Sequence, residues 1–339
     1  MIELNQGTLS FSFPEIHPKA KLAVSFQRTL RIPDDGTDYP LPAGLGKFPM
    51  EHVDDHLRRA PSQWLEHGGV MLPMYQGEAM YIDFSSSYVA GHDVQYPFAV
   101  KIAAGKIDAV TGEGWREELS ATRQNYVVSP EQPWLDGFCV EQGVIRQFVA
   151  MPLGAGFSVE EQLTGEAEHG GLQIMVYPMS KRAFERHHPK KDERVIRCFS
   201  SPLYLEDSDP SMGMGAGGRM RQQVYDDPYD LGDWETKTSS RCFVHLTDSQ
   251  SWEKITRRPP PTEPPTAATY KKAGVPWFDH YVEAPVVGGS GILRGVKSVT
   301  EIDTEKGGPA VISDDSIAVD GVIQLRKDLS DGQVREGEF

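Results

Sequence analysis

Short apolar segments separated by turn residues run through the first two thirds of the chain. Each is rich in β-branched and aromatic residues and is bounded by Gly, Pro, Asn or Asp, a pattern that predicts β-strands. The predicted strands are 79–84, 98–102, 106–110, 144–150 and 172–177. Two of them lie on either side of Ala104-Gly105, where the glycine favours the tight turn of a hairpin.

Helical patterns are short and few. The segments that carry one are 50–59, 181–188, 251–256 and 267–273. Ser180 and Thr266 stand where an N-cap side chain is preferred, and Gly274 stands where a helix commonly ends. Thr247 and Gln250 have the spacing of a capping box. No helical segment is long enough to organise a bundle. The sequence therefore predicts a β-rich α+β protein with antiparallel, sandwich-like sheets and short peripheral helices.

Two stretches of unusual composition interrupt this pattern. Residues 211–220 (SMGMGAGGRM) are glycine-rich and predict a flexible turn, and residues 257–266 (RRPPPTEPPT) are proline-rich and predict a polyproline II arm. Either stretch can be a linker or an interface element. The predicted division has a β-rich core region at 1–205 and a smaller mixed region at 206–339, and a single domain stays open as the alternative.

The overall composition restricts where the protein works. The 339 residues carry a net charge of −15, which disfavours binding to nucleic acids and to anionic membranes. The N-terminal residues lack the pattern of a secretory signal, and no apolar run approaches the roughly 20 residues that span a bilayer. Three separated cysteines, Cys139, Cys198 and Cys242, suit a reducing compartment. We therefore expect a cytoplasmic protein with no nucleic-acid or membrane partner.

Charge is segregated along the chain. Residues 181–197 hold seven Lys or Arg against three Asp or Glu, whereas residues 299–339 hold ten Asp or Glu against four Lys or Arg. The two segments can meet within one chain or between copies, or both can simply be solvated. Together with the tryptophan-containing loops and the proline-rich stretch, this segregation favours a homo-oligomer or a protein partner.

The glycine-rich stretch also contains the bare pattern of a dinucleotide-binding fingerprint. Gly213, Gly215 and Gly218 have the G-x-G-x-x-G spacing. That fingerprint needs a strand before it and a helix after it, and the flanking sequences predict neither. We therefore expect a turn and no bound nucleotide cofactor.

Metal ligation has one candidate pair. His52 and His56 are four residues apart, so on a helix both imidazoles would share a face and reach one divalent ion. Cys242 and His245 are three apart, which in a strand sends them to opposite faces. Each pair is more often structural than ligating, so a divalent metal is a possibility and no cofactor is the expectation.

A cluster of carboxylates around one histidine is the strongest candidate for catalysis. Glu160, Glu161, Glu166, Glu168 and His169 lie within ten residues, and carboxylates beside an imidazole are the groups of general acid–base or metal chemistry. Glu166, Glu168 and His169 are the candidate catalytic residues. The spacing fits no fixed helix face, so a solvated acidic loop is the alternative.

The same histidine belongs to a repeated tetrapeptide. Glu-His-Gly-Gly occurs at 66–69 and again at 168–171, and each copy runs into an apolar segment. A chain of this length produces about one such repeat by chance. The shared feature is a glycine turn that leads into a strand, with Gly68 as the residue that ends a short helical turn. Only the second copy stays a candidate site, unless His67, His169, His52 and His56 converge in space.

Three stretches carry a resemblance. They are PWLDGFCVEQGVIRQFVAMPLGAGFSVEEQLTGEAEHGGLQIMVYPM, FQRTLRIPDD and PPTAATYKKAGVPWFDHY. Together they resemble a family of bacterial and fungal proteins to which no function is assigned. The resemblance therefore implies no site residue, and it implies that most of the chain forms one self-standing unit.

These observations lead to two functional hypotheses. The first is a cytoplasmic, non-catalytic protein that binds other proteins or copies of itself, because no catalytic motif is complete. The alternative is a metal-dependent or acid–base enzyme, or a small-molecule binder, that uses the Glu/His loop at 160–169.

Overall fold

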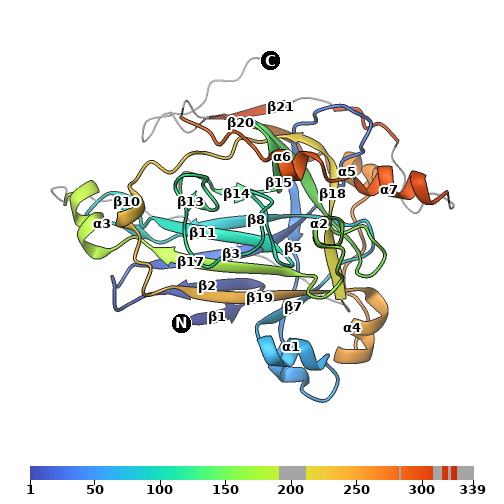
Figure 1. Cartoon of the computed structure of the whole chain (residues 1–339), viewed down its shortest axis with the longest axis horizontal. Helices are drawn as coiled ribbons and strands as arrows, with labels where there is room; N and C mark the ends of the chain where they lie inside the picture. The colour runs from blue at the N-terminus through green and yellow to red at the C-terminus, as the bar shows by residue number, and fades with distance from the viewer. Residues whose placement is uncertain (191–210, 282–283, 308–314, 320–321, 327–339) are drawn as a thin grey trace.

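The computed structural model describes residues 1–190, 211–281, 284–307, 315–319 and 322–326. Within these residues the strands dominate and the helices are short. The predicted α+β class with large antiparallel sheets is confirmed (Figure 1). No helix of the described residues is both long and apolar enough to cross a membrane.

One large curled sheet organises the molecule (Figure 1). Its main path runs β1 (Ile2–Asn5), β2 (Thr8–Ser12), β3 (Lys21–Thr29), β8 (Ala79–Ser86), β16 (Val144–Pro152), β18 (Ser211–Arg221), β19 (Ser240–Thr247), β17 (Leu172–Pro178), β11 (Phe98–Ala104) and β12 (Ile107–Asp108). Further strands join this path at its sides, namely β5 (Gly44–Lys47), β6 (Glu51–His52), β7 (Val70–Pro73), β13 (Val127–Ser129), β14 (Trp134–Leu135) and β15 (Gly137–Glu141).

Two small sheets complete the strand pairing. One joins β9 (Tyr88–Val89) to β10 (Val94–Gln95), and the other has the order β21 (Val322–Arg326), β20 (Trp277–Tyr281), β4 (Leu41–Pro42). Two of the described pairs are parallel, β7 with β19 and β20 with β21. Every other described pair between strands is antiparallel, which suits short turns rich in glycine.

The two halves of the curled sheet pack onto one hydrophobic core. Phe26 and Ile82 from β3 and β8 belong to the same buried cluster as Val100 and Val176 from β11 and β17. All seven residues of β11 are buried, as expected for a strand that is covered on both faces. Each such apolar side chain contributes about 1.5–3 kcal/mol when it is fully buried. The core thus fixes the strands on which the candidate site is built.

Short helices lie around the sheet (Figure 1). They are α1 (Ser62–His67), α2 (Val159–Thr164), α3 (Lys181–His187), α4 (Ser249–Thr256), α5 (Ala267–Ala273), α6 (Gly291–Arg294) and α7 (Val299–Lys306), with the 3-10 turns η1 (Val53–His56) and η2 (Leu231–Asp233). The predicted caps of α3 and α5 are confirmed, because Ser180 and Thr266 accept backbone hydrogen bonds there. Gly274 ends α5 in the left-handed conformation, also as predicted.

The predicted helix over 50–59 is wrong. Glu51–His52 forms strand β6, which pairs with β7, and only the single turn η1 follows it. The backbone N–H of Val53 donates to the carbonyl of Gly69, so strand pairing replaces the first turn of the expected helix. His52 and His56 therefore do not share a helical face.

Two further boundaries differ from the sequence-based prediction. Asp248 caps α4 instead of Thr247, which is the last residue of β19 and whose hydroxyl donates to the carbonyl of Leu72. The strand predicted at 106–110 ends at Asp108, because its carboxylate accepts the backbone N–H groups of Val110 and Thr111 and turns the chain.

The glycine-rich stretch at 211–220 is a strand, and the predicted flexible turn is wrong. It forms β18, which pairs with β16 over most of its length. A Cβ added at Gly215 would lie 2.8 Å from Val299, one at Gly217 would lie 2.6 Å from Val149, and one at Gly218 would lie 2.2 Å from the carbonyl of Pro33. The glycines therefore serve close packing against neighbouring elements, a known role of glycine in strands.

The proline-rich stretch at 257–266 connects α4 to α5. It contacts the main sheet region through an ion pair between Arg258 and Glu51 and a hydrogen bond from Arg28 to the carbonyl of Glu263. The boundary predicted near residue 205 lies outside the described residues. Strands β18 and β19 follow this boundary in the chain. They pair with β16, β17 and β7, which precede it.

Candidate functional site

The two copies of Glu-His-Gly-Gly meet at one strand. The first copy leads into β7 and the second leads into β17, and both strands pair with β19 from opposite sides. Val244 is the register partner of Val70 on one side and of Leu172 on the other. β7 runs parallel to β19 and β17 runs antiparallel, so the copies are similar turns and not a duplicated fold.

Glycine is required where each copy approaches β19. A Cβ at Gly69 would lie 2.2 Å from the carbonyl oxygen of Phe243, and one at Gly171 would lie 2.6 Å from that of Val244. Both glycines also have a positive φ, at 91° and 59°. The repeated Gly-Gly pair therefore brings two chain segments tightly against the same strand, and the histidine before each pair is carried to the same place.

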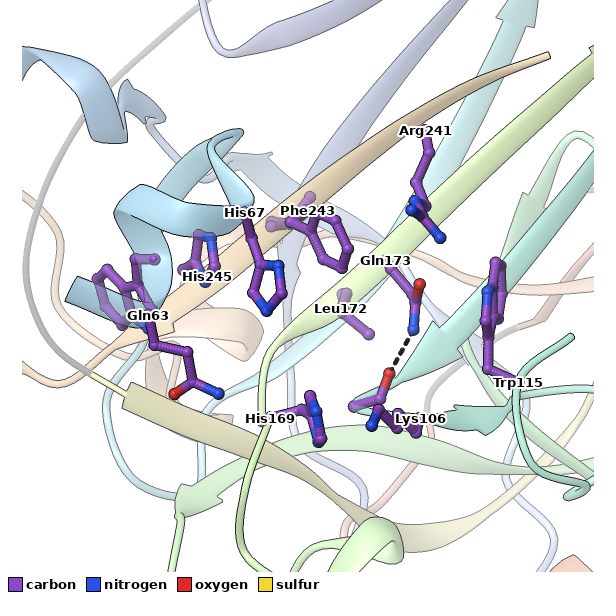
Figure 2. Close-up of a pocket in the computed structure, with 14 residues that line it drawn as sticks. Gln63, His67, Lys106, Trp115, His169, Leu172, Gln173, Arg241, Phe243 and His245 are labelled. Carbon is purple, nitrogen blue, oxygen red and sulfur yellow. Dashed lines mark hydrogen bonds between the residues drawn. The ribbon is translucent and has the colours of Figure 1, made fainter. Parts of the chain in front are cut away.

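A pocket of about 270 Å³ lies between these elements. Its walls come from α1, the start of β17, β19 and the turn between β11 and β12 (Figure 2). The lining side chains are Gln63, Trp64, His67, Lys106, Trp115, His169, Leu172, Gln173, Arg241, Phe243, Val244 and His245, with Gly105 and Gly170. His67 and His169 thus converge on one cavity, as the sequence left open. His52 and His56 are not among the lining residues.

His169 is held by a buried carboxylate. Its Nδ1 lies 3.1 Å from Oε1 of Glu160, whose side chain is only 4% exposed. The same carboxylate accepts the backbone N–H groups of Lys106 (3.1 Å) and Gly170 (3.0 Å). An ionised carboxylate only accepts, so the imidazole carries its proton on Nδ1 and presents a lone pair at Nε2. This is the arrangement of an oriented general base.

The turn between β11 and β12 makes room for that carboxylate. A Cβ at Gly105 would lie 2.2 Å from Oε2 of Glu160, and Gly105 also has a φ of 57°. Glu160 reaches the turn from α2, which Ser158 and Glu161 start with a capping box. The sequence predicted the hairpin at Ala104-Gly105. In the structure its turn leaves space for the carboxylate of Glu160 next to His169.

The far end of the pocket is cationic and aromatic. Figure 2 shows Arg241 and Trp115 at one end and Gln63, His245 and His67 at the other. The guanidinium of Arg241 lies 5.1 Å from the ring centroid of Phe243 and pairs with Glu117 at 2.8 Å. The indole Nε1 of Trp115 is buried and has no hydrogen-bond partner among the described residues.

The opposite end is a stack of rings. His67 stacks on Phe243 with centroids 4.7 Å apart, and His245 stacks on Trp64 at 4.8 Å. Nε2 of His245 lies 2.9 Å from the carbonyl of Gly68, to which it donates. Burial lowers the pKa of His245 to about 4. Gln63 lies on the same helix as His67, and its amide donates to the carbonyl of Glu168 in the second copy at 2.8 Å.

The other predicted site residues lie elsewhere. Glu166 and Glu168 are exposed and do not line the pocket, although they flank His169 in sequence. Glu161 forms the capping box of α2 with Ser158 and does not contact His169 in the described hydrogen bonds. Within the expected loop at 160–169, the structure brings together Glu160 and His169, and residues up to Thr164 form a helix.

The predicted metal pair is separated. His52 is exposed, whereas His56 is buried with its Nε2 2.7 Å from Glu51. Among the described residues no group of three or more His, Cys, Asp or Glu side chains is arranged to hold a metal ion. Cys139 and Cys242 are free and buried, and burial raises the pKa of each thiol to about 12. A thiol in that state is a poor nucleophile.

Sequence reasoning missed half of the pocket. Lys106, Trp115 and the β19 residues Arg241 and Phe243 carried no recognised motif. A signal was present, since residues 241, 243 and 245 alternate as Arg, Phe and His and must share one face of a strand. This face lines the pocket because β19 lies between the strands that follow the two tetrapeptides, an arrangement that the local sequence does not encode.

Comparison with known proteins gives no relative from which a function can be transferred. No family model, no curated protein and no solved structure matches this chain.

Proposed function

We propose that the protein is an enzyme that binds a small organic anion in the pocket at β19 and removes a proton from it with His169. The observation that carries this proposal is the contact between Nδ1 of His169 and the buried carboxylate of Glu160. It gives a pocket-lining imidazole a fixed orientation and a basic Nε2, which general base catalysis requires.

The charge of the lining supports an anionic ligand. Among the described residues that line the pocket, the Lys and Arg side chains are Lys106 and Arg241, and none is Asp or Glu. Arg241 offers a planar set of donors that matches a carboxylate. The rings of Phe243 and Trp64 and the side chain of Leu172 supply apolar walls. A carboxylate with an apolar or aromatic body fits this combination.

The chemical step follows from the hydrogen bonds of His169. A C–H or O–H proton of the ligand moves to Nε2, and the imidazolium that results keeps its Nδ1–H bond to Glu160. The negative charge of Glu160 stabilises that imidazolium, while its two backbone donors hold the carboxylate in position. A positioned base of this kind contributes about 10²–10⁴-fold to a rate.

Two measurements test the proposal. Calorimetric titration with a panel of small aliphatic and aromatic carboxylates should identify binders, and the matching amides or alcohols should bind at least about tenfold more weakly. For each binder, proton NMR in D₂O should show protein-dependent exchange of an acidic C–H, which His169→Asn should abolish without loss of binding. The proposal is overturned if no carboxylate binds, or if exchange persists unchanged in the variant.

The expectation of a non-catalytic protein that binds partners or copies of itself stays a prediction, because the structure holds a single chain. A metal-dependent mechanism is not part of the proposal, since the groups beside His169 are one carboxylate and two backbone donors.

A further inference from the structure

A second cavity, of about 250 Å³, is lined by residues of the small β4–β20–β21 sheet and by residues in or next to strands β8 and β14 of the main sheet. It shares no lining residue with the pocket at β19. Three of its lining residues are aromatic and come from three different strands, namely Tyr81, Trp134 and Phe278. Two more are the carboxylates Asp83 and Asp136, and the remaining ones are aliphatic residues or glycine.

The carboxylates of this cavity have no cation among its lining residues. Asp136 is 1% exposed, and the amide of Gln222 holds its Oδ2 at 2.6 Å while accepting its backbone N–H at 2.9 Å. Asp83 accepts a long hydrogen bond of 3.4 Å from Ser25. Among the described residues no Lys or Arg lines the cavity and no ion pair includes either aspartate, and the nearest cation that acts on Asp83 is Lys47, outside the lining. A buried carboxylate without a cation is costly to keep, so a ligand that supplies the positive charge is favoured.

The aromatic rings select the kind of cation. An organic ammonium group is attracted to the faces of Trp, Tyr and Phe, and cavities that combine such rings with a carboxylate recognise alkylated amines. Gly44 makes room for one wall, since a Cβ there would lie 2.4 Å from the hydroxyl of Tyr81. We propose that the cavity between β8, β14 and β20 binds a small organic ammonium cation, which the rings of Tyr81, Trp134 and Phe278 enclose and the carboxylates of Asp83 and Asp136 neutralise.

Burial adds a pH dependence to this site. It raises the pKa of Asp136 to about 7 and also raises that of Asp83. The other titratable groups near the two carboxylates are Tyr81 of β8, Tyr270 of α5 and Lys47 of β5. His280 of β20 lies against Trp134 in the cavity wall, with ring centroids 5.0 Å apart. A cation favours the ionised form of Asp136, so binding should strengthen as the pH rises from 6 to 8. The proton that Asp136 loses goes to solvent.

The test uses the full chain and defined probes. Choline is titrated by isothermal calorimetry, with 3,3-dimethylbutan-1-ol as its neutral counterpart of the same shape and ethanolamine as a cation with N–H groups. We expect at least one cation to bind with a dissociation constant below about 1 mM, and the neutral alcohol to bind at least about tenfold more weakly. Affinity for the cation should rise between pH 6 and pH 8.

Variants assign the binding to this cavity. Asp83→Asn and Phe278→Leu each remove one feature of the lining and should weaken cation binding about tenfold or more. Asp136→Asn should flatten the pH dependence. Glu3→Gln, on the exposed face of β1, removes a matched charge outside the cavity and should change nothing. Thermal unfolding confirms that each variant is folded. Equal binding of choline and the alcohol, no binding of either cation, or affinity unchanged in both Asp83→Asn and Phe278→Leu overturns the proposal.

Discussion

The pocket at β19 and the cavity at β8 bury their carboxylates in opposite ways. Glu160 accepts two backbone N–H groups and an imidazole, all from turns that are folded around it. Asp136 accepts the side-chain amide of Gln222 at 2.6 Å and a side-chain hydrogen bond from Trp134, and burial raises its pKa to about 7. Glu160 already contacts the imidazole of His169, whereas Asp136 has no cation among the described residues that line its cavity. The two acids therefore differ in the kind of donor around them, which is backbone N–H and imidazole for Glu160 and side-chain amide and indole for Asp136.

The largest expected effect comes from removing the charge of Glu160. Glu160→Gln keeps the shape of the side chain and offers no anion to Nδ1 of His169, so ligand proton exchange should fall about 10²–10⁴-fold. That fall corresponds to about 3–5 kcal/mol in the barrier. The measurement is proton exchange by NMR at saturating carboxylate. Glu166→Gln is the matched control, because Glu166 is exposed and should leave the rate unchanged. Equal exchange rates in the wild type, Glu160→Gln and Glu166→Gln would show that the charge of Glu160 does not act on His169.

The next effect tests whether the turn at Gly105 is built for Glu160. Gly105→Ala places a Cβ 2.2 Å from Oε2 and forces an L-residue to a φ of 57°. We expect a loss of about 2–4 kcal/mol in the free energy of unfolding, measured with urea. Gly165→Ala has a φ of 77° with nothing within 4 Å, so it isolates the backbone strain and should cost about 1 kcal/mol. Equal losses would show that the carboxylate moves aside freely.

A third prediction uses the raised pKa of Asp136. Its carboxyl is protonated in the folded state up to about pH 7 but only to about pH 4 in the unfolded state, so the proton stabilises the fold at low pH. That stabilisation is complete below about pH 4 and is lost as the pH rises through 7. Asp136→Asn should therefore match the wild type near pH 4 and exceed it at pH 8 by on the order of 2–4 kcal/mol. A constant difference across this range in urea unfolding would contradict the assignment.

The smallest effect concerns Arg241 at the open end of the first pocket. Its side chain is 35% exposed and pairs with Glu117, so solvent screens part of its charge. Arg241→Gln should weaken carboxylate binding about tenfold in calorimetry, with little change in the exchange rate at saturation. Glu117→Gln leaves the guanidinium available and should keep or improve the affinity. Weaker binding in both variants would mean that the ion pair, not the guanidinium, shapes the pocket.

Local patterns in the sequence were enough for most of the fold. The caps at Ser180 and Thr266 act through bonds to residues three positions away, and the strands at 79–86, 144–152 and 172–178 were recognisable from their composition. The glycine-rich strand β18 was not, because glycine has no intrinsic preference for strands. Its alternation of Met212 and Met214 with Gly213 and Gly215 has the period of a strand. The glycines are needed there because neighbouring elements pack closely against them, which the local sequence does not show.

The site depended on contacts that no local pattern encodes. His169 was a candidate because of the acidic residues around it, yet the two nearest in sequence, Glu166 and Glu168, are exposed. Glu160 reaches it because α2 begins at Ser158 and the chain then folds back. His67 reaches the same pocket through the pairing of β7 with β19. The sequence therefore named His169 as a candidate, and spacing alone could not single out Glu160 among the nearby glutamates as its contact.

The position of β19 has a consequence for how the site can arise during synthesis. The ring of His245 on β19 bonds to the carbonyl of Gly68, 177 residues earlier, and β17 must lie on the other side of the same strand. A nascent chain that lacks its last hundred residues therefore contains both histidines of the repeat without the surface that gathers them. The proposed proton-transfer activity would therefore appear only after β19 has emerged and inserted, and its onset would report the completion of folding.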